Sequence, residues 1–303
     1  MYILNKLVVA TLPTIPVPIV RYFASRYIAG EQIADAVRVV RQLNNEGLLT
    51  TLDVLGEDVH SREEALSARD SIIEVMNSIS REHLRSNVSI KLSQLGLKLD
   101  KNLCLENVRK IVVTARDLDN FIRIDMEDST CTDDTIWVYR ELRKELSNVG
   151  IALQAYLKRT LSDAENLIDR GYGNFRFCKG IYVEPEQIAF KHRDEINQHY
   201  IRTLRTMLER KAYVGIATHD DSLVRAAYNV IDELKLQKQE YEFQMLLGVR
   251  PDLRGKIVRD GHRTRVYVPF GKHWYKYSIR RFKENPQIAG YVFRSLFTRN
   301  KST

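Results

Sequence analysis

Short apolar stretches alternate with longer amphipathic segments along most of the chain. The segments that separate the short stretches place apolar residues three and four apart, which is typical of helices, for example at 33–43, 63–79, 135–146 and 222–234. The short stretches are rich in apolar or β-branched residues and have the length of buried strands: residues 49–55, 88–92, 121–125, 151–155, 174–178, 213–218, 242–246 and 265–268. Because a crossover between parallel strands needs a helix, the alternation predicts parallel pairing.

Eight strands with helices between them, spread over about 250 residues, predict an α/β fold of the (β/α)8, or TIM-barrel, type. The last strand should end at Pro269, and two further helical stretches follow it, at 273–284 and 288–299. We therefore expect an extra C-terminal helix. Because no Pro/Gly/Ser-rich linker interrupts the pattern, residues 31–303 are predicted to form a single barrel domain.

Residues 1–30 are predicted to form an amphipathic segment that leads into the barrel. They contain no acidic residue, and their apolar run at 7–20 is interrupted by three prolines. This run is shorter than the ~20 residues needed to span a bilayer, so we expect no membrane-spanning helix. An organellar transit peptide would also lack acidic residues, but the barrel pattern begins too early to leave much to cleave. We expect the segment to pack on the barrel or to touch a membrane.

The positive charge of the chain is concentrated near its C-terminus. The chain has a net charge of +8, yet residues 250–303 hold 14 Lys/Arg against 3 Asp/Glu. Such a segment suits an anionic ligand or lipid surface, and no zinc-finger, RRM or KH pattern points to nucleic acid. The three cysteines are scattered without a CxxC pair, which favours a reducing compartment and argues against a structural zinc site. We expect a cytoplasmic protein.

Candidate catalytic residues lie at or just past the ends of six predicted strands, where barrels of this type carry out their chemistry. Lys91 interrupts an apolar strand, so it should face either a ligand or an acid with which it forms a structural pair. Asp125 could be a metal ligand, a base or a loop cap, but no histidine is placed to complete a metal site, and we expect no metal. The polar residues at these ends are Lys91, Asp125, Gln154, Lys179, Thr218, His219 and Gln244.

The helix predicted after the last strand carries Tyr277, Arg280, Arg281 and Glu284. Positions three and four apart share a helix face, so the tyrosine stands beside both arginines. Two guanidinium groups next to a phenol form a clamp for a small carboxylate. The alternative is a solvated helix with an Arg280–Glu284 pair. Glu57, after the first strand, could pair with Arg280 to close the site, or the two could form an ordinary surface ion pair.

Seven blocks of the chain carry a family resemblance. One is 265–286, and the other six are Val88-Ser-Ile-Lys-Leu-Ser-Gln-Leu95, Ile124-Asp-Met-Glu127, Leu153-Gln-Ala-Tyr156, Arg176-Phe-Cys-Lys-Gly-Ile-Tyr182, Ala217-Thr-His219 and Tyr241-Glu-Phe-Gln-Met245. In this order they resemble the signature of the proline dehydrogenases, FAD-dependent enzymes that oxidise L-proline. The resemblance covers about residues 42–297. Because the chain stops soon after the barrel, we expect the monofunctional bacterial type, without an aldehyde dehydrogenase domain.

The resemblance implies a reaction and a substrate site. Hydride would pass from C5 of L-proline to N5 of the flavin, giving Δ1-pyrroline-5-carboxylate, the first step of proline degradation to glutamate. The electrons would then go to a membrane quinone, which requires peripheral contact with the inner face of the cell membrane. Lys91, Arg280 and Arg281 would bind the substrate carboxylate. The residues expected around the proline ring are Tyr182, Leu246, Tyr267 and Tyr277.

The resemblance also implies how FAD is held over the barrel mouth, although the chain has no GxGxxG loop. Arg176 would lie near flavin N5, where negative charge grows on reduction, and Lys179 on the pyrophosphate. Asp125 would accept a hydrogen bond from Tyr267 and steer or accept the proton of the proline nitrogen. Further contacts with FAD are expected from Met126, Gln154, Gly180, Ile181, Thr218, His219, Gln244 and Glu284.

The chain departs from the family pattern at two places. Ile181 stands where the family usually has alanine, and its larger side chain could narrow the pocket. Leu247-Gly248-Val249 replaces the usual Tyr-Gly-Met.

Two other functions fit the residues alone: a lyase or aldolase that forms a Schiff base at Lys91 or Lys179, and a non-catalytic basic barrel that binds RNA or lipid. A flavin spectrum would distinguish them from the dehydrogenase.

Overall fold

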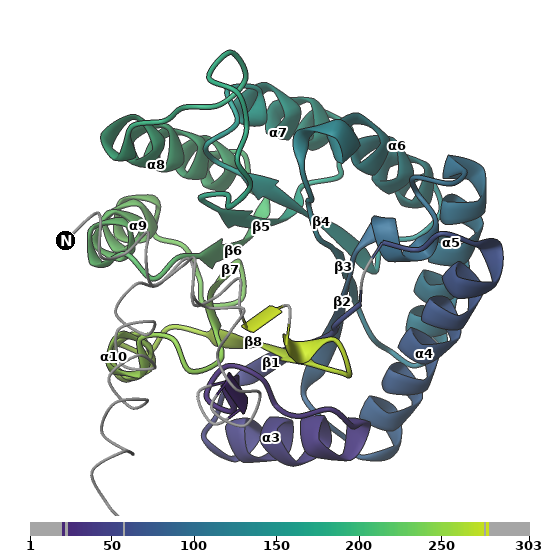
Figure 1. Cartoon of the computed structure of the whole chain (residues 1–303). Coiled ribbons are helices and arrows are strands. Elements are labelled where there is room, and N and C mark those ends of the chain that lie inside the picture. Colours follow the sequence, from purple (N-terminus) through teal and green to yellow (C-terminus); the bar gives the residue numbers. More distant parts are fainter. Residues whose placement is uncertain (1–19, 22–23, 57, 276, 279–303) are drawn as a thin grey trace, which may run out of the picture.

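A computed structural model describes residues 20–21, 24–56, 58–275 and 277–278 of the protein. Within them, eight parallel strands close into one barrel in which β1 pairs with β8 (Figure 1). The strands are β1 (Leu49–Val54), β2 (Ser86–Ile90), β3 (Ile122–Ile124), β4 (Val149–Gln154), β5 (Asn174–Cys178), β6 (Tyr213–Ala217), β7 (Tyr241–Leu246) and β8 (Thr264–Phe270). The predicted (β/α)8 barrel is confirmed.

Helices form a ring around the strands (Figure 1). Among the described elements, α3 precedes β1, and one α-helix follows each strand from β1 to β7. In chain order they are α3 (Ile33–Asn45), α4 (Arg62–Arg81), α5 (Lys101–Asp117), α6 (Thr132–Arg143), α7 (Thr160–Asp169), α8 (Arg193–Glu209), α9 (Asp221–Leu234) and α10 (Pro251–Arg259). Two short 3-10 helices, η2 (Leu92–Leu95) and η3 (Ser129–Cys131), follow β2 and β3 and shape the rim of the barrel.

Polar side chains cap the N-terminal ends of several helices by accepting hydrogen bonds from backbone N–H groups there. At the start of α4, Ser61 Oγ accepts a hydrogen bond from the Glu64 N–H (3.1 Å), and the Glu64 carboxylate accepts one from the His60 N–H (2.7 Å). At the start of α9, Asp220 accepts one from the Ser222 N–H (3.0 Å). These caps fix where the chain leaves the strand-end loops, and the Asp220 cap lies on the rim of the barrel.

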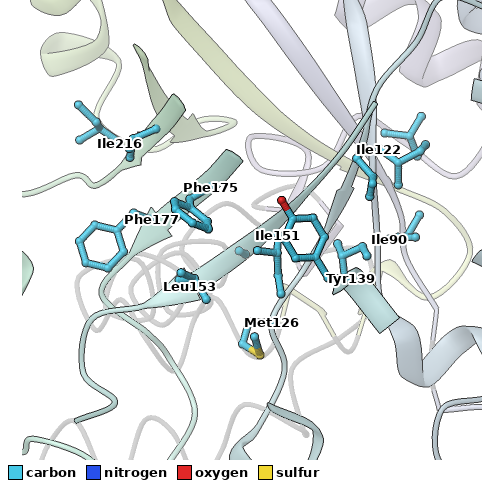
Figure 2. Packing of buried hydrophobic residues seen from close by; sticks show 14 of the residues in the cluster. Ile90, Ile122, Met126, Tyr139, Ile151, Leu153, Phe175, Phe177 and Ile216 are labelled. Carbon is cyan, nitrogen blue, oxygen red and sulfur yellow. The ribbon is translucent and has the colours of Figure 1, made fainter. Parts of the chain in front are cut away.

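Apolar side chains fill the layer between the sheet and the helices. Ile90, Ile151, Phe175 and Ile216 are at most 1% exposed and belong to one cluster with apolar residues of the surrounding helices (Figure 2). Successive strand residues point to opposite faces, so the residues that alternate with these face the barrel interior. The interior positions include Ser89, Arg123, Arg176, Glu242 and Gln244. The interior of this barrel is therefore largely polar.

Two glycines make room for large polar side chains inside the barrel. A Cβ atom on Gly150 would lie 2.3 Å from Arg123 Nη1, and one on Gly215 would lie 2.3 Å from Gln244 Nε2. No side chain fits at such distances, so the absence of Cβ on β4 and β6 lets an arginine and a glutamine cross the interior.

The C-terminal ends of β2 and β8 differ by two residues from the sequence prediction, while the other C-terminal strand ends agree with it to within one residue. β2 ends at Ile90, so Lys91 does not interrupt the strand but lies between it and η2, as the N-cap residue of that short helix. β8 does not end at Pro269, because that residue pairs with Asp53 of β1 and its carbonyl accepts a hydrogen bond from the Ala29 N–H (2.9 Å). Proline lacks an N–H group but keeps its acceptor, so a strand can continue through it where only the carbonyl is needed.

Several predicted segments lie partly outside the described residues. Residues 274–275 and 277–278 are helical, in agreement with the predicted helix 273–284. The rest of that helix, the helix predicted at 288–299 and most of the leading segment 1–30 fall outside. In the portion of the chain that is described, no helix is both long and apolar enough to cross a bilayer.

Candidate active site

A cavity of about 590 Å³ opens at the C-terminal ends of the barrel strands. Small-molecule sites usually have volumes of roughly 300–1,000 Å³, so its size suits a ligand. Every predicted site residue that the structure describes lines it: Lys91, Asp125, Met126, Gln154, Arg176, Lys179, Gly180, Ile181, Tyr182, Thr218, His219, Gln244, Leu246, Tyr267 and Tyr277. Four other predicted residues, Glu57, Arg280, Arg281 and Glu284, lie outside the described residues.

Arg176, on β5, is the buried cation at the centre of this cavity and is 7% exposed. It forms an ion pair with Asp125 and donates a hydrogen bond to Ser89 Oγ (3.0 Å). The Tyr267 ring lies 5.0 Å from its guanidinium carbon, and the Tyr267 hydroxyl donates to Asp125 Oδ2 (2.9 Å), the hydrogen bond that the resemblance implies. Burial favours the neutral acid, but Arg176 and Lys91 outweigh this effect and hold the pKa of Asp125 below its usual range.

Lys91 is held between two carboxylates. Its Nζ donates to Asp53 Oδ1 (2.7 Å) and to the Tyr267 hydroxyl (3.4 Å), and it lies 3.6 Å from Asp125 Oδ2. Burial disfavours the ammonium form, but Asp53 and Asp125 outweigh burial and raise the pKa of Lys91 above its ordinary value. Schiff-base chemistry requires a lysine with a lowered pKa, so this environment argues against the aldolase alternative at Lys91.

A second set of contacts fixes the orientation of Gln244 on β7. Arg176 Nε donates to Gln244 Oε1 (2.6 Å), and Gln244 Nε2 donates to Glu242 Oε1 (2.7 Å). Arg265 also binds Glu242, with Nε 2.6 Å from Oε1 and Nη2 3.1 Å from Oε2. Burial would raise the pKa of Glu242, but Arg265 and these hydrogen bonds lower it, so the carboxylate stays charged deep in the barrel.

Gln154, at the end of β4, presents an unsatisfied acceptor to the cavity. Its Nε2 donates to the carbonyl of Met126 (3.1 Å), while its Oε1 is buried and has no hydrogen-bond partner among the described residues. A buried amide oxygen without a partner is costly, so this atom is suited to accept a hydrogen bond from an N–H group of a ligand.

The loop between β5 and α8 supplies a cationic side of the cavity. Lys179 Nζ and Arg193 Nη2 both lie 2.8 Å from Asp220 Oδ2. Burial opposes ionisation of Asp220, but its hydrogen bonds with Lys179, Ser222 and Arg193 hold its pKa well below the usual range. Two cations share one carboxylate here, which leaves a net positive charge for an anionic ligand.

The ends of β6 and β7 meet at His219. Its Nε2 accepts a hydrogen bond from the Leu246 N–H (2.9 Å), so in the neutral ring the proton is on Nδ1. Arg250 Nη1 reaches the His219 carbonyl (3.5 Å) and forms an ion pair with Asp221 (2.8 Å). These contacts hold the two strand-end loops together at the cavity wall.

Sequence reasoning missed five charged residues that line the cavity: Asp53, Arg193, Asp220, Asp221 and Arg250. Asp53 interrupts the apolar stretch 49–55, a signal of the same kind as the one that singled out Lys91. Asp220 directly follows Thr218 and His219, but its pairing with residues 179 and 193 depends on the fold.

Comparisons with known proteins agree on one family. A family model described as proline dehydrogenase matches residues 36–294. Proline dehydrogenase 1 of Bacillus subtilis (strain 168) is 34% identical over 276 residues, which are 91% of this chain and 91% of that protein. The proline dehydrogenase of Deinococcus radiodurans is 36% identical over 278 residues, which are 90% of this chain and 89% of that protein.

Solved structures show the same fold. Proline utilization A (PutA) from Bdellovibrio bacteriovorus, inactivated by N-propargylglycine, matches with a TM-score of 0.83 at 24% identity. PutA from Corynebacterium freiburgense matches with a TM-score of 0.76 at 22% identity. The matches cover 93% and 96% of this chain but 34% of each PutA chain, so this chain spans about a third of their length.

Proposed function

The chain belongs to the proline dehydrogenase family, and from this premise we propose that it oxidises L-proline with non-covalently bound FAD. The observation that carries the proposal is the composition of the cavity at the C-terminal ends of the strands. Its wall combines the buried cation Arg176, the ion-paired Lys91 and the unsatisfied amide oxygen of Gln154. This set suits a ring with an N–H donor and a small carboxylate.

The described residues fit FAD at three points. Gln154 Oε1 would accept a hydrogen bond from a flavin ring N–H, and Lys179 with Arg193 would attract the pyrophosphate. Bound FAD would supply the hydride acceptor, N5 of its ring. Arg176 would stabilise the negative charge that accompanies reduction, and its contacts with Asp125, Ser89 and Gln244 keep the guanidinium in place beforehand.

Substrate binding is assigned to Lys91 and the aromatic wall. The ammonium group of Lys91 makes hydrogen bonds to Asp53 and Tyr267, which leaves one of its three N–H groups for a carboxylate. Tyr182, Leu246, Tyr267 and Tyr277 line the same cavity and would enclose the proline ring. Arg280 and Arg281, which the sequence analysis assigns to a carboxylate clamp, would bind the substrate carboxylate together with Lys91.

The reaction requires the loss of a proton and of a hydride. The secondary ammonium of proline would first give a proton to solvent, which frees the nitrogen lone pair to form the C5=N bond when the C5 hydride leaves. Asp125 is poorly suited to accept the proton, because both of its oxygens already accept hydrogen bonds and its pKa is held low. We assign it to holding Arg176 and Tyr267 in position.

We further propose that the electrons pass to a membrane quinone and that the chain works in the cytoplasm, in peripheral contact with the inner face of the membrane. The support is the charge of residues 250–303, which hold 14 Lys/Arg and 3 Asp/Glu. Quinones reside in the bilayer, and basic segments are attracted to anionic lipid.

The test is the spectrum of the purified chain after incubation with FAD. We expect a flavin absorbance band, release of free FAD on denaturation, and bleaching of the band when L-proline is added without oxygen. D-proline at the same concentration is the control and should bleach the band far more slowly. A chain that stays colourless, or a flavin that proline does not reduce, would contradict the proposal.

A further inference from the structure

A second cavity lies at the opposite end of the barrel from the active site. Its volume is about 670 Å³, and it is lined by residues at the N-terminal ends of the strands, among them Leu49, Ser86, Phe121 and Asn174. Chemistry in these barrels is carried out at the other end, so the proposed proline oxidation does not account for this cavity.

A buried guanidinium without a counter-ion faces this cavity. Arg123, on β3, is 2% exposed and lines the cavity wall. Its Nη atoms donate to neutral acceptors only: Nη1 to the carbonyl oxygens of Ile151 (3.2 Å) and Asn174 (2.8 Å), and Nη2 to Asn174 Oδ1 (2.7 Å). Its Nε has no hydrogen-bond partner, and no carboxylate of the described residues forms an ion pair with it. A buried charge of this kind normally has a partner of opposite sign.

The pairing of charges inside the barrel leaves Arg123 as the excess cation. Lys91 pairs with Asp53 and Arg176 with Asp125 at the active-site end, while Arg265 pairs with Glu242 further down. These three pairs are each neutral. In the described part of the interior, the uncompensated positive charge therefore falls on Arg123, at the end where the second cavity opens.

The mouth of the second cavity is also basic. Arg85, Arg263 and Asp119 line the cavity, as does the ion pair of Arg265 with Glu242, so the basic residues of the lining outnumber the acidic ones. Arg263 is half-buried and makes no ion pair with any carboxylate that the structure describes. A small anion that enters would thus meet a positive rim before it reaches Arg123.

A hydrogen-bond acceptor in the wall of the second cavity limits which kind of anion can bind there. Asn148 lines this cavity together with Arg123, and its Oδ1 is buried with no hydrogen-bond partner among the described residues. A ligand that satisfies both atoms must accept a hydrogen bond from Arg123 Nε and donate one to Asn148. Hydrogen phosphate does both, whereas sulfate and chloride have no proton to donate at neutral pH.

We propose that the cavity at the N-terminal end of the barrel is an anion site that binds a protonated oxyanion of the hydrogen phosphate class. The anion neutralises Arg123 and stabilises the folded barrel. Ligands that bind only the folded state raise its unfolding temperature with concentration.

The test titrates inorganic phosphate into the FAD-loaded chain, with calorimetry for binding and thermal unfolding for stability, at constant ionic strength. We expect saturable binding, a rise in unfolding temperature, and a weaker effect from sulfate. Replacement of Arg263 by Gln removes a charge at the mouth and should weaken phosphate binding by about tenfold. The Arg123→Met variant should lose binding, and Arg263→Gln keeps the proposal testable if Arg123→Met does not fold.

The control is Arg225→Gln, because Arg225 is an exposed residue of α9 outside this cavity. It should bind phosphate as tightly as the unmodified chain. Anions of high charge density stabilise many proteins by exclusion from the surface, so a general salt effect must be distinguished from binding. No saturable binding, sulfate as effective as phosphate, or equal binding by the Arg263→Gln and Arg225→Gln variants would each overturn the proposal.

Discussion

At the scale of single residues, buried charges at the active-site end form balanced pairs. Lys91 pairs with Asp53 and Arg176 with Asp125, so these residues carry two positive and two negative charges. Around these two pairs, a substrate carboxylate meets no excess of positive charge from the described residues. It must therefore depend on a direct hydrogen bond from Lys91 and on the arginines assigned from the sequence.

Replacement of Lys91 by Met should weaken proline binding by about 2–5 kcal/mol, the range for removal of one partner of a buried charge pair. It should also lower the free energy of unfolding by about 3–5 kcal/mol, because Asp53 is 1% exposed and would keep its charge without a partner. A proline titration of the flavin absorbance and urea unfolding measure the two effects separately.

The matched control is the double variant Asp53→Asn/Lys91→Met, which removes the pair as a whole. It should recover most of the lost stability, since no isolated charge remains, but not the affinity for proline. Affinity that is unchanged in Lys91→Met, or restored in the double variant, would contradict the role assigned to Lys91.

The residue scale also shows what the sequence can predict about this site. Lys91 was identifiable because it interrupts the apolar stretch 88–92, and the expectation that it faces either a ligand or an acid left its partner open. That partner is set by the register of two strands, in which Asp53 of β1 aligns with Ser89 of β2. Local sequence does not specify such a register, so the pair becomes visible only in the closed barrel.

At the scale of elements, the loop between β5 and α8 depends on one glycine. Gly180 has φ of +107°, and a Cβ atom there would lie 2.0 Å from the ring of Tyr156. Side chains rarely adopt this backbone conformation, and the ring leaves no space for one. The loop that carries Lys179 and Ile181 therefore has its present path because this position has no side chain.

The Gly180→Ala variant should retain less FAD after gel filtration and lose about 1–3 kcal/mol of stability, as expected for backbone strain at one residue. The ratio of flavin to protein absorbance and chemical unfolding provide the two measurements. Gly255→Ala is the control: Gly255 lies inside α10, and the nearest atom to an added Cβ would be Arg259 Nη1 at 3.3 Å. That variant should gain about 0.5–1 kcal/mol and keep its FAD. Full retention of FAD by Gly180→Ala would refute this role of the loop.

The turn between α10 and β8 carries a histidine that should make stability depend on pH. His262 Nδ1 lies 2.8 Å from the Tyr241 hydroxyl, and its ring meets the Phe243 ring edge-on at 5.3 Å. Burial lowers the pKa of His262 below its ordinary value of 6.5, and nearby Asp260 only partly opposes this. Between the folded-state pKa and pH 6.5, the unfolded chain therefore binds a proton that the folded chain does not.

The stability that depends on neutral His262 is fully present above pH 6.5 and is lost as the pH falls through the folded-state pKa. The difference in unfolding free energy between the unmodified chain and His262→Gln should accordingly be constant above pH 6.5 and shrink below it. Urea unfolding of both proteins over this pH range measures the difference. A difference that is flat across the range would show that His262 does not make stability depend on pH. A difference that grows as the pH falls would show a pKa shift of the opposite sign.

Element order was the part of the fold that the sequence predicted best. All eight strands follow the predicted order, because apolar stretches separated by amphipathic segments are a local signal. The residues at which the strands end were less predictable. The continuation of β8 through Pro269 depends on hydrogen bonds with β1 and with Ala29, which are distant in the sequence, so the local rule that proline ends a strand failed there.

At the scale of the whole molecule, the barrel has an apolar outer layer and a polar interior. The outer layer between sheet and helices holds the fold together, while the interior carries charged groups from the active-site cavity to the cavity at the other end. The sequence pattern indicated where each strand lies. Which of the two faces would become the interior depends on closure of the sheet, and that is a property of all eight strands together.

The uneven charge of the molecule leads to a prediction about membranes. Residues 250–303 are strongly basic while the rest of the chain is slightly acidic, with 33 Lys/Arg against 36 Asp/Glu. Each basic residue near an anionic surface contributes about 1 kcal/mol, and salt screens this attraction. The FAD-loaded chain should therefore co-sediment with vesicles that contain phosphatidylserine at low salt, and much less at high salt.

The charges responsible can be tested with two matched triple variants. Arg294→Gln/Arg299→Gln/Lys301→Gln removes three charges from the basic segment and should weaken vesicle binding by about a hundredfold, the factor expected for about 3 kcal/mol. Arg62→Gln/Lys110→Gln/Arg225→Gln removes the same net charge from exposed positions elsewhere and should have a much smaller effect, because those residues lie outside the basic segment. Equal losses in the two triple variants would mean that net charge alone drives binding. Binding that salt does not weaken would rule out an electrostatic contact altogether.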